Sequence, residues 1–274
     1  MIISIDDTNY TLDAPQWGYQ VTINTALIVS ALLPKDYAIW DNGASNMKRF
    51  LKLNWLMDAT KTGTLTDTFN DVNKGRGVSC YFKLGNNSGF FPFGPDLGDT
   101  GDFQCRLINL SPGGMLEAPW KYFNTEATFV MESNPSYSLP TEVSEGDLAI
   151  GGISNLRYPP NMPDSSTEYG FSTQVTYDGT AYTIDKTSDA DAYHTTLGMV
   201  CNESKAAALI DDLITNVRDA TLNIVSQSNN YIFGEEGGSN ATYVCRWLNE
   251  AMTVTHTRFN EFAFDLSFYR VSQS

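Results

Sequence analysis

The sequence contains the same short patterns twice, at a nearly constant distance. Cys105–Asn109 (Cys-Arg-Leu-Ile-Asn) returns 140 positions later as Cys245–Asn249 (Cys-Arg-Trp-Leu-Asn). Three further matches keep the same order, with shifts between 136 and 143: Asn86-Asn87 with Asn229-Asn230, Phe93-Gly94 with Phe233-Gly234, and Phe123–Ala127 with Phe259–Ala263. Matches that keep their order while the loops between them change length are typical of a duplicated unit. Both halves are therefore expected to build the same fold.

Each half is predicted to be mainly β-structure with one helix, an α+β fold. Thr64-x-x-Asp67 is typical of a helix start in the first half, and Ser204 is the expected N-cap in the second. The apolar residues that would share one helix face are Leu65, Phe69 and Val72, and then Leu209, Leu213 and Val217. Strand-like runs follow each helix, at Gly77–Leu84, Phe103–Asn109 and Glu126–Glu132, and at Ala220–Ser226, Thr242–Asn249 and Phe262–Phe268.

Upstream of the helices the sequence allows two alignments of the halves. One sets Asp6–Asp13 against Asp178–Asp185, and the other sets Gln20–Thr22 against Gln174–Thr176. In either alignment each half opens with a strand pair around an Asp-Asp or Asp-Gly turn.

Proline is concentrated between the halves. Ser133–Gly170 contains five prolines, and proline is excluded from central strands. Leu148–Ile150 would still suit a short edge strand. We therefore expect a first domain at residues 1–134, a linker or arm at residues 135–167, and a second domain at residues 168–274.

The chain is strongly acidic. Its formal net charge is −15, from 17 basic and 32 acidic side chains, and residues 135–274 account for −11 of it. Affinity for nucleic acid rests mainly on Lys and Arg, so tight binding to nucleic acid is not expected. Met1–Asp7 has no basic region and Ala26–Pro34 is about half of a membrane span, so neither a secretory signal nor a membrane protein is expected.

Residues able to carry out catalysis are few. The two histidines, His194 and His256, have no neighbouring nucleophile motif, although Cys201 follows His194 by seven residues. We expect both to be turn or surface histidines. The cysteines lack the spacing of zinc ligands and are expected to pack as reduced thiols: Cys80, Cys105, Cys201 and Cys245.

Three carboxylates in one segment suggest a cation, and aromatic residues suggest a sugar platform. Asp96, Asp99 and Asp102 could supply oxygen ligands, but their spacing does not match a calcium loop, so a solvated acidic loop is predicted. Four tryptophans are expected in or beside turns: Trp17, Trp40, Trp55 and Trp120. No catalytic, cofactor-binding or metal-binding residue is predicted.

The order of elements resembles the tail-tube fold of bacteriophage tails. That order is a strand pair, a helix, a strand, an Asn/Gly-rich hairpin, a strand, and a last strand of the Phe-Asn-x-x-Ala type, over roughly Tyr10–Ser133 and Glu168–Val271. Tube, distal-tail and baseplate-hub proteins share this fold. The resemblance implies two tandem β-sandwich or barrel domains, no enzymatic activity, and a ring around a lumen through which the tape-measure protein and DNA pass.

We therefore expect a structural virion protein, made in the cytoplasm of the host bacterium, in which three chains form a ring with pseudo-sixfold symmetry. Its partners would be copies of itself and neighbouring tube, hub and tape-measure proteins, and DNA would pass without specific binding. The hairpins Asn86–Asp102 and Asn229–Ser239 would reach the neighbouring ring, and no cofactor is expected. The alternatives are a carbohydrate-binding pair of β-sandwiches and a glycoside hydrolase with paired carboxylates.

Overall fold

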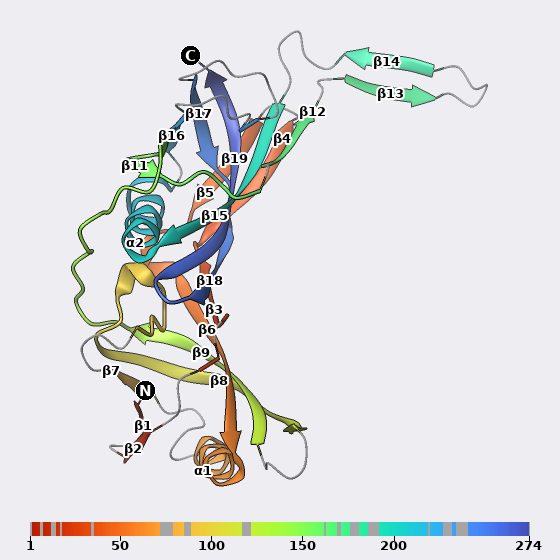
Figure 1. Cartoon of the computed structure of the whole chain (residues 1–274). Helices are drawn as coiled ribbons and strands as arrows, with labels where there is room; N and C mark the ends of the chain where they lie inside the picture. The colour runs from red at the N-terminus through yellow and green to blue at the C-terminus, as the bar shows by residue number, and fades with distance from the viewer. Residues whose placement is uncertain are drawn as a thin grey trace.

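The computed structural model describes residues 2–5, 8–11, 15–16, 18–33, 36–71, 79–84, 89–116, 122–161, 163–168, 171–175, 181–185, 192–218, 220–226, 232–233 and 241–273. Over these residues the chain is mainly antiparallel β-structure with two α-helices, α1 (Ala59–Asn70) and α2 (Glu203–Asp212), one in each half (Figure 1). Helix α2 continues into a π-helical turn, Leu213–Val217. The expected fold class, mainly β with one helix in each half, is confirmed.

The strands of the first half are β1 (Ile2–Ile5), β2 (Thr8–Thr11), β3 (Gln20–Asn24), β4 (Leu27–Leu33), β5 (Asp36–Asp41), β6 (Lys48–Asp58), β7 (Cys80–Leu84), β8 (Gly101–Leu116) and β9 (Tyr122–Ser133). Those of the second half are β10 (Leu148–Ile150), β11 (Ile153–Leu156), β12 (Asp164–Glu168), β13 (Phe171–Val175), β14 (Ala181–Asp185), β15 (Ala192–Asn202), β16 (Thr221–Ser226), β17 (Ala241–Trp247), β18 (Ala251–Arg258) and β19 (Glu261–Gln273).

Fifteen strands form one continuous sheet that passes through both halves. Its order is β11-β10-β16-β17-β19-β18-β3-β6-β9-β8-β7-β1-β2, with β15 paired to β19 and β12 paired to β15. Each domain was expected to be a β-sandwich or a barrel, and because this sheet does not close on itself among the described residues, the barrel alternative is wrong. The buried apolar side chains of both halves also belong to one core cluster, because strand pairing holds the halves together.

The same strand order occurs in both halves. The run β6-β9-β8-β7 of the first half corresponds to β15-β19-β17-β16 of the second, and a hairpin adds to the outer edge of β7 and of β16 alike. Gln20 pairs with Lys52, and Asp164 pairs with Thr196, so both partners move by 144 positions. Strand β3 therefore corresponds to β12, and the sheet follows neither of the two alignments that the sequence allowed.

Both helices begin directly after a strand. The side chain of Asp58 accepts a hydrogen bond from the backbone N–H of Lys61, and Asn202 accepts one from Lys205, again 144 positions later. The helix starts expected at Thr64 and Ser204 are therefore wrong, since Thr64 lies inside α1 and Ser204 inside α2. The predicted apolar faces are buried where described: Leu65 and Phe69, and Leu209, Leu213 and Val217. Val72 lies outside the described residues.

The alternating run at the end of the chain forms a half-buried strand, as predicted. Phe262, Phe264, Leu266 and Phe268 of β19 are all buried, because alternate residues of a strand face the same side of the sheet. In the first half, Ala127 and Phe129 of β9 take the corresponding positions and are also buried.

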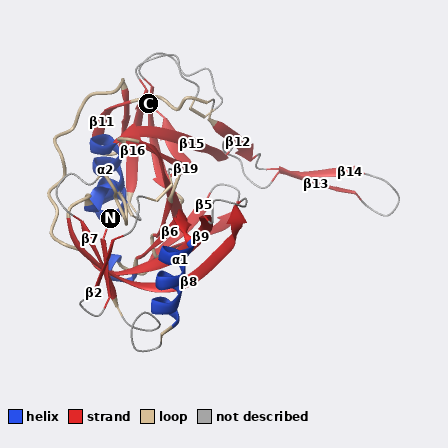
Figure 2. Ribbon diagram, turned by 60° about the horizontal axis from the view of Figure 1, so that its bottom comes forward, coloured by secondary structure: helices blue, strands red, loops and turns tan. Residues whose placement is uncertain are grey.

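Two hairpins lie outside the main sheet, and a non-repetitive segment connects the halves. The β4–β5 and β13–β14 hairpins leave the sheet after β3 and β12, and β13–β14 projects away from the body (Figures 1 and 2). Of the expected linker at residues 135–167, residues 148–150 and 153–156 and the part of β12 up to residue 167 form strands of the main sheet. The part without regular structure, residues 134–147, is called the arm below; it runs along the outer side of α2 (Figure 1).

Neither helix of the described chain has the length and apolar character that crossing a membrane requires.

Candidate functional site

The histidines and the cysteine that were candidates for catalysis lie on strands. His194 and Cys201 are both on β15; His194 is half-buried, and Cys201 is fully buried. Burial raises the pKa of the Cys201 thiol to about 12, so this thiol is protonated at neutral pH and is a poor nucleophile. All four cysteines are buried and unbridged, as expected for side chains that pack as small hydrophobes.

His256 is buried in β18, so its prediction as a turn or surface residue is wrong. Its Nδ1 lies 2.6 Å from the hydroxyl oxygen of Tyr19, and its ring stacks on Phe262 with centroids 4.5 Å apart. Burial lowers the pKa of His256 to about 4. The imidazole is therefore neutral at pH 7 and joins a strand of the second half to the segment before β3.

The acidic segment at residues 96–102 is only partly solvated. Asp96 is 7% exposed and forms an ion pair with Arg49, so the prediction of a solvated loop is wrong for this residue. Asp99 accepts a hydrogen bond from the N–H of Gly89, and Asp102 is exposed as expected. Among the described residues no three His, Cys, Asp or Glu side chains are grouped to hold a metal ion.

The tryptophans do not form an exposed platform where they are described. Trp55 and Trp247 are completely buried, which corrects the expected turn position of Trp55, while Trp40 is half-exposed on β5. Trp17 and Trp120 lie outside the described residues.

The two halves of the chain are joined where β3 pairs with β18. Their register runs from Gln20 opposite Thr255 to Asn24 opposite Ala251. Beyond the strand ends, the N–H of Thr25 donates to the carbonyl of Glu250 at 3.0 Å. Val21 and Ile23, with Met252 and Val254, are buried on one face of the junction. The two halves are thus joined by main-chain hydrogen bonds and by the core.

Arg218 strengthens the junction at one end. Its guanidinium donates to both carboxylate oxygens of Asp41 and to the carbonyl of Thr25, at 2.5 to 2.8 Å. The Arg218 side chain also lowers the pKa of Asp41 by hydrogen bonding to its carboxylate. Because Arg218 follows α2 and Asp41 ends β5, this pair connects the helix of the second half to the hairpin of the first.

A segment of the first half covers the other end of the junction. Residues 89–100 fold back over it, with the Phe91 N–H donating to the Tyr19 hydroxyl and the Phe91 ring packing edge-on against Phe262. The segment is held by Arg49, which donates to Asp96 and to the carbonyl of Phe93. The described part of the hairpin Asn86–Asp102 therefore packs on its own chain rather than projecting toward a neighbour. Of the corresponding hairpin, Asn229–Ser239, only residues 232–233 lie within the described part.

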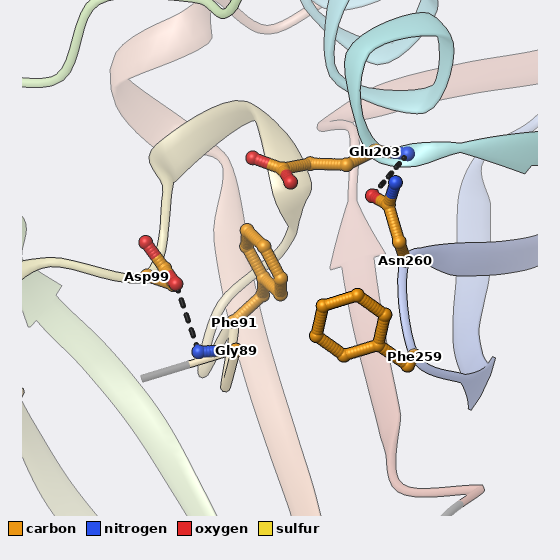
Figure 3. Close-up of a pocket in the computed structure, with 6 residues that line it drawn as sticks. All are labelled: Gly89, Phe91, Asp99, Glu203, Phe259 and Asn260. Atoms are coloured by element: carbon orange, nitrogen blue, oxygen red, sulfur yellow. Dashed lines mark hydrogen bonds between the residues drawn. The ribbon is translucent and has the colours of Figure 1, made fainter. Parts of the chain in front are cut away.

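A pocket of about 140 Å³ opens beside this segment (Figure 3). Its lining comes from both halves: Gly89, Phe91 and Asp99 from the first, and Glu203, Phe259 and Asn260 from the second. Burial and the nearby Asp99 carboxylate raise the pKa of Glu203, opposed by its hydrogen bond with Tyr137. The Phe259 side chain is 76% exposed.

The arm binds the N-terminal end of α2. Val143 donates its N–H to the hydroxyl of Ser204, and Glu145 accepts from the N–H of Asn202. Tyr137 lies against Gly98, where an added Cβ would overlap the tyrosine ring. The arm therefore packs on its own chain at these residues, where it connects α2 to residues 96–101.

Gly98→Ala should destabilise the protein by about 2–4 kcal/mol, because Gly98 has a φ of +77° and its new methyl group would displace Tyr137. Gly63→Ala is the matched control. Gly63 lies within α1 with no atom near its prospective Cβ, so this change should stabilise by about 0.5–1 kcal/mol. Urea unfolding measures both, and equal effects would contradict the packing of the arm.

Lys205 is 2% exposed at its side chain, and its ammonium group bonds Glu142 at 2.5 Å and the Ser154 carbonyl at 2.6 Å. Glu142→Ala should cost about 2–3 kcal/mol, because it leaves the buried ammonium without a counter-charge. Lys205→Met should cost less than about 1 kcal/mol, because the remaining carboxylate is 42% exposed and can be hydrated. Thermal unfolding measures the loss of stability in each variant. A larger loss in Lys205→Met than in Glu142→Ala would contradict this account.

Strands β3 and β18, which pair at the junction, each have a structural counterpart in the other half. Among the described residues neither counterpart pairs with a strand in the same way. Strand β12, the counterpart of β3, pairs with β15 on one side and with no described strand on the other. Strand β8 pairs with β7 only from Gly101 to Cys105, and its remaining residues up to Leu116 pair with β9 alone in the described chain. In the described part of the chain there is therefore one completed junction, between β3 and β18, and one unpaired edge of each kind, on β12 and on β8.

A scan against models of known protein families finds no match for this chain, and a search of curated proteins finds no similar sequence.

Proposed function

We propose that the protein is a structural, non-enzymatic component of a bacteriophage tail, in which three chains assemble into a ring around a lumen. Each chain would supply two equivalent tail-tube-like units, so the ring would have pseudo-sixfold symmetry. The tape-measure protein and then DNA would pass through the lumen, and neighbouring rings of the tail would be its partners.

The pairing of β3 with β18 is the observation that carries this proposal. It joins two units of the same strand order edge to edge, and among the described residues the unit at each end keeps an edge without a partner strand. A head-to-tail contact of this kind generates a ring when its rotation closes. Three chains would then supply six units, with three junctions inside chains and three between them.

The acidic charge of the chain suits a passage for DNA. A net charge of −15 makes the average surface repel phosphate, and a ring of three chains would multiply this charge. DNA would therefore move along the wall without binding to it.

Light scattering coupled to size-exclusion chromatography tests the ring directly. We expect a particle with the mass of three 30.3 kDa chains, and electron microscopy of the same fraction should show a central opening. A protein that remains monomeric at every concentration would refute the proposal.

A further inference from the structure

We propose that the open edge of β12 in one chain pairs in antiparallel fashion with the open edge of β8, beyond Cys105, in a second copy of the chain. This inference rests on the proposed ring and names the surface that would build it. The occupant is a second copy because the chain already contains the same contact once, between β3 and β18.

The correspondence of β12 with β3 comes from pairing register rather than from residue identity. Both strands pair with the strand that leads into a helix, at positions 144 residues apart, and both are followed by a hairpin that leaves the main sheet. Asp58 and Asn202, the caps that end the partner strands, are separated by the same 144 positions.

The correspondence of β8 with β17 and β18 comes from their common partner strand. Cys105 lies opposite Met131 and Cys245 opposite Arg270, while at the far end Leu116 lies opposite Tyr122 and Arg258 opposite Glu261. The last part of β8 thus occupies the place of β18. In a second copy this part would receive β12 as β18 receives β3.

The new junction would depend on main-chain hydrogen bonds more than the internal one does. Ser165 and Thr167 correspond to Val21 and Ile23, which are buried at the internal junction. Because small polar residues bury less apolar surface, association between chains should be weaker than association within a chain, and it should depend on concentration.

Residues that point outward from β12 can be assigned from β3. The N–H of Thr25 points toward β18, and alternate residues of a strand point to the same neighbour, so Ile23 and Val21 share this direction. Their counterparts Thr167 and Ser165 should present N–H groups at the open edge. Ser165→Pro should therefore weaken association at least tenfold and keep the thermal midpoint of the dissociated chain within a few degrees, because an outward edge position tolerates proline. Ser165→Ala keeps the N–H and serves as the control.

Disulfide trapping tests the pairing itself. Ser166 corresponds to Thr22, whose hydroxyl oxygen lies 3.5 Å from that of Thr253 across the internal junction. Ser166→Cys would be combined in turn with Ser111→Cys, Pro112→Cys and Gly113→Cys, which cover the irregular register of β8. The Thr22→Cys, Thr253→Cys variant, which bridges within one chain, is the positive control, and the native thiols are all buried.

Oxidation with oxidised glutathione should link chains of at least one combination into covalent multimers of up to three, reversible by dithiothreitol, while Ser166→Cys alone yields none. If light scattering shows a particle of several chains and no combination links, this pairing is refuted and the proposed ring stands. If the protein is monomeric at every concentration, both are refuted.

Discussion

Asp96→Ala should destabilise the protein by about 3–5 kcal/mol. Asp96 and Arg49 are 2% and 3% exposed at their side chains, so removal of the carboxylate leaves a buried guanidinium with no counter-charge. The same carboxylate fixes residues 89–100 over the β3·β18 junction, so the loss should affect both halves. Urea unfolding followed by fluorescence is a suitable measurement, because Trp55 and Trp247 are buried in different halves.

Glu126→Ala is the matched control for that experiment. Its partner Lys52 is 46% exposed, and surface pairs contribute at most about 1 kcal/mol. The double variant Arg49→Met, Asp96→Leu should recover much of the loss, because apolar side chains of similar size need no counter-charge. Equal losses for Asp96→Ala and Glu126→Ala would contradict a structural role for the buried pair.

Acidification from pH 7 to pH 4.5 should lower the free energy of unfolding by about 2 kcal/mol through His256 alone. Burial holds the pKa of His256 at about 4 in the folded protein, against 6.5 for an ordinary histidine. Between these values the unfolded chain binds the proton and the folded chain does not, so stability is complete above about pH 6.5 and is lost as the pH falls toward 4.

His256→Phe isolates this contribution, since the phenyl ring can still stack on Phe262 and does not titrate. The variant should lose about 2 kcal/mol less than the wild type over the same pH interval, in urea unfolding at both pH values. If the free energy of unfolding of His256→Phe depended on pH as strongly as that of the wild type, other groups would cause the acid sensitivity.

The sequence predicted the strands that carry a strong apolar pattern, and the reason is local. From Phe262 to Phe268, large apolar residues alternate with small or polar ones, so their periodicity alone determines which face is buried. The helix starts were missed because each half offered competing caps: Ser204 donates its hydroxyl to Asn202, which is the true cap. In the first half, Asp58 ends a long strand with no turn residue before the helix.

The two ion pairs described at and beside the junction could not be found from local patterns. Arg49 and Asp96 are 47 positions apart, and Arg218 and Asp41 are 177 apart, so no short motif connects them. One signal existed, because Arg49 occupies the buried phase of the alternating strand β6 with Leu51 and Leu53, and a buried arginine requires an acidic partner. The correspondence of β3 with β12 has no such signal, since Gln-Val-Thr-Ile-Asn and Asp-Ser-Ser-Thr-Glu are identical at no position.

Because β3 pairs with β18, this part of the sheet cannot form until nearly the whole chain has been synthesised. Thr22 and Thr253 are 231 residues apart, and a ribosome adding about 5–20 residues per second needs roughly 10–50 s to synthesise that span. Throughout this interval the nascent first half carries a strand edge whose partner does not yet exist. A folding chaperone or the ribosome surface would have to shield that edge, and a chain interrupted before Ala251 should aggregate through it.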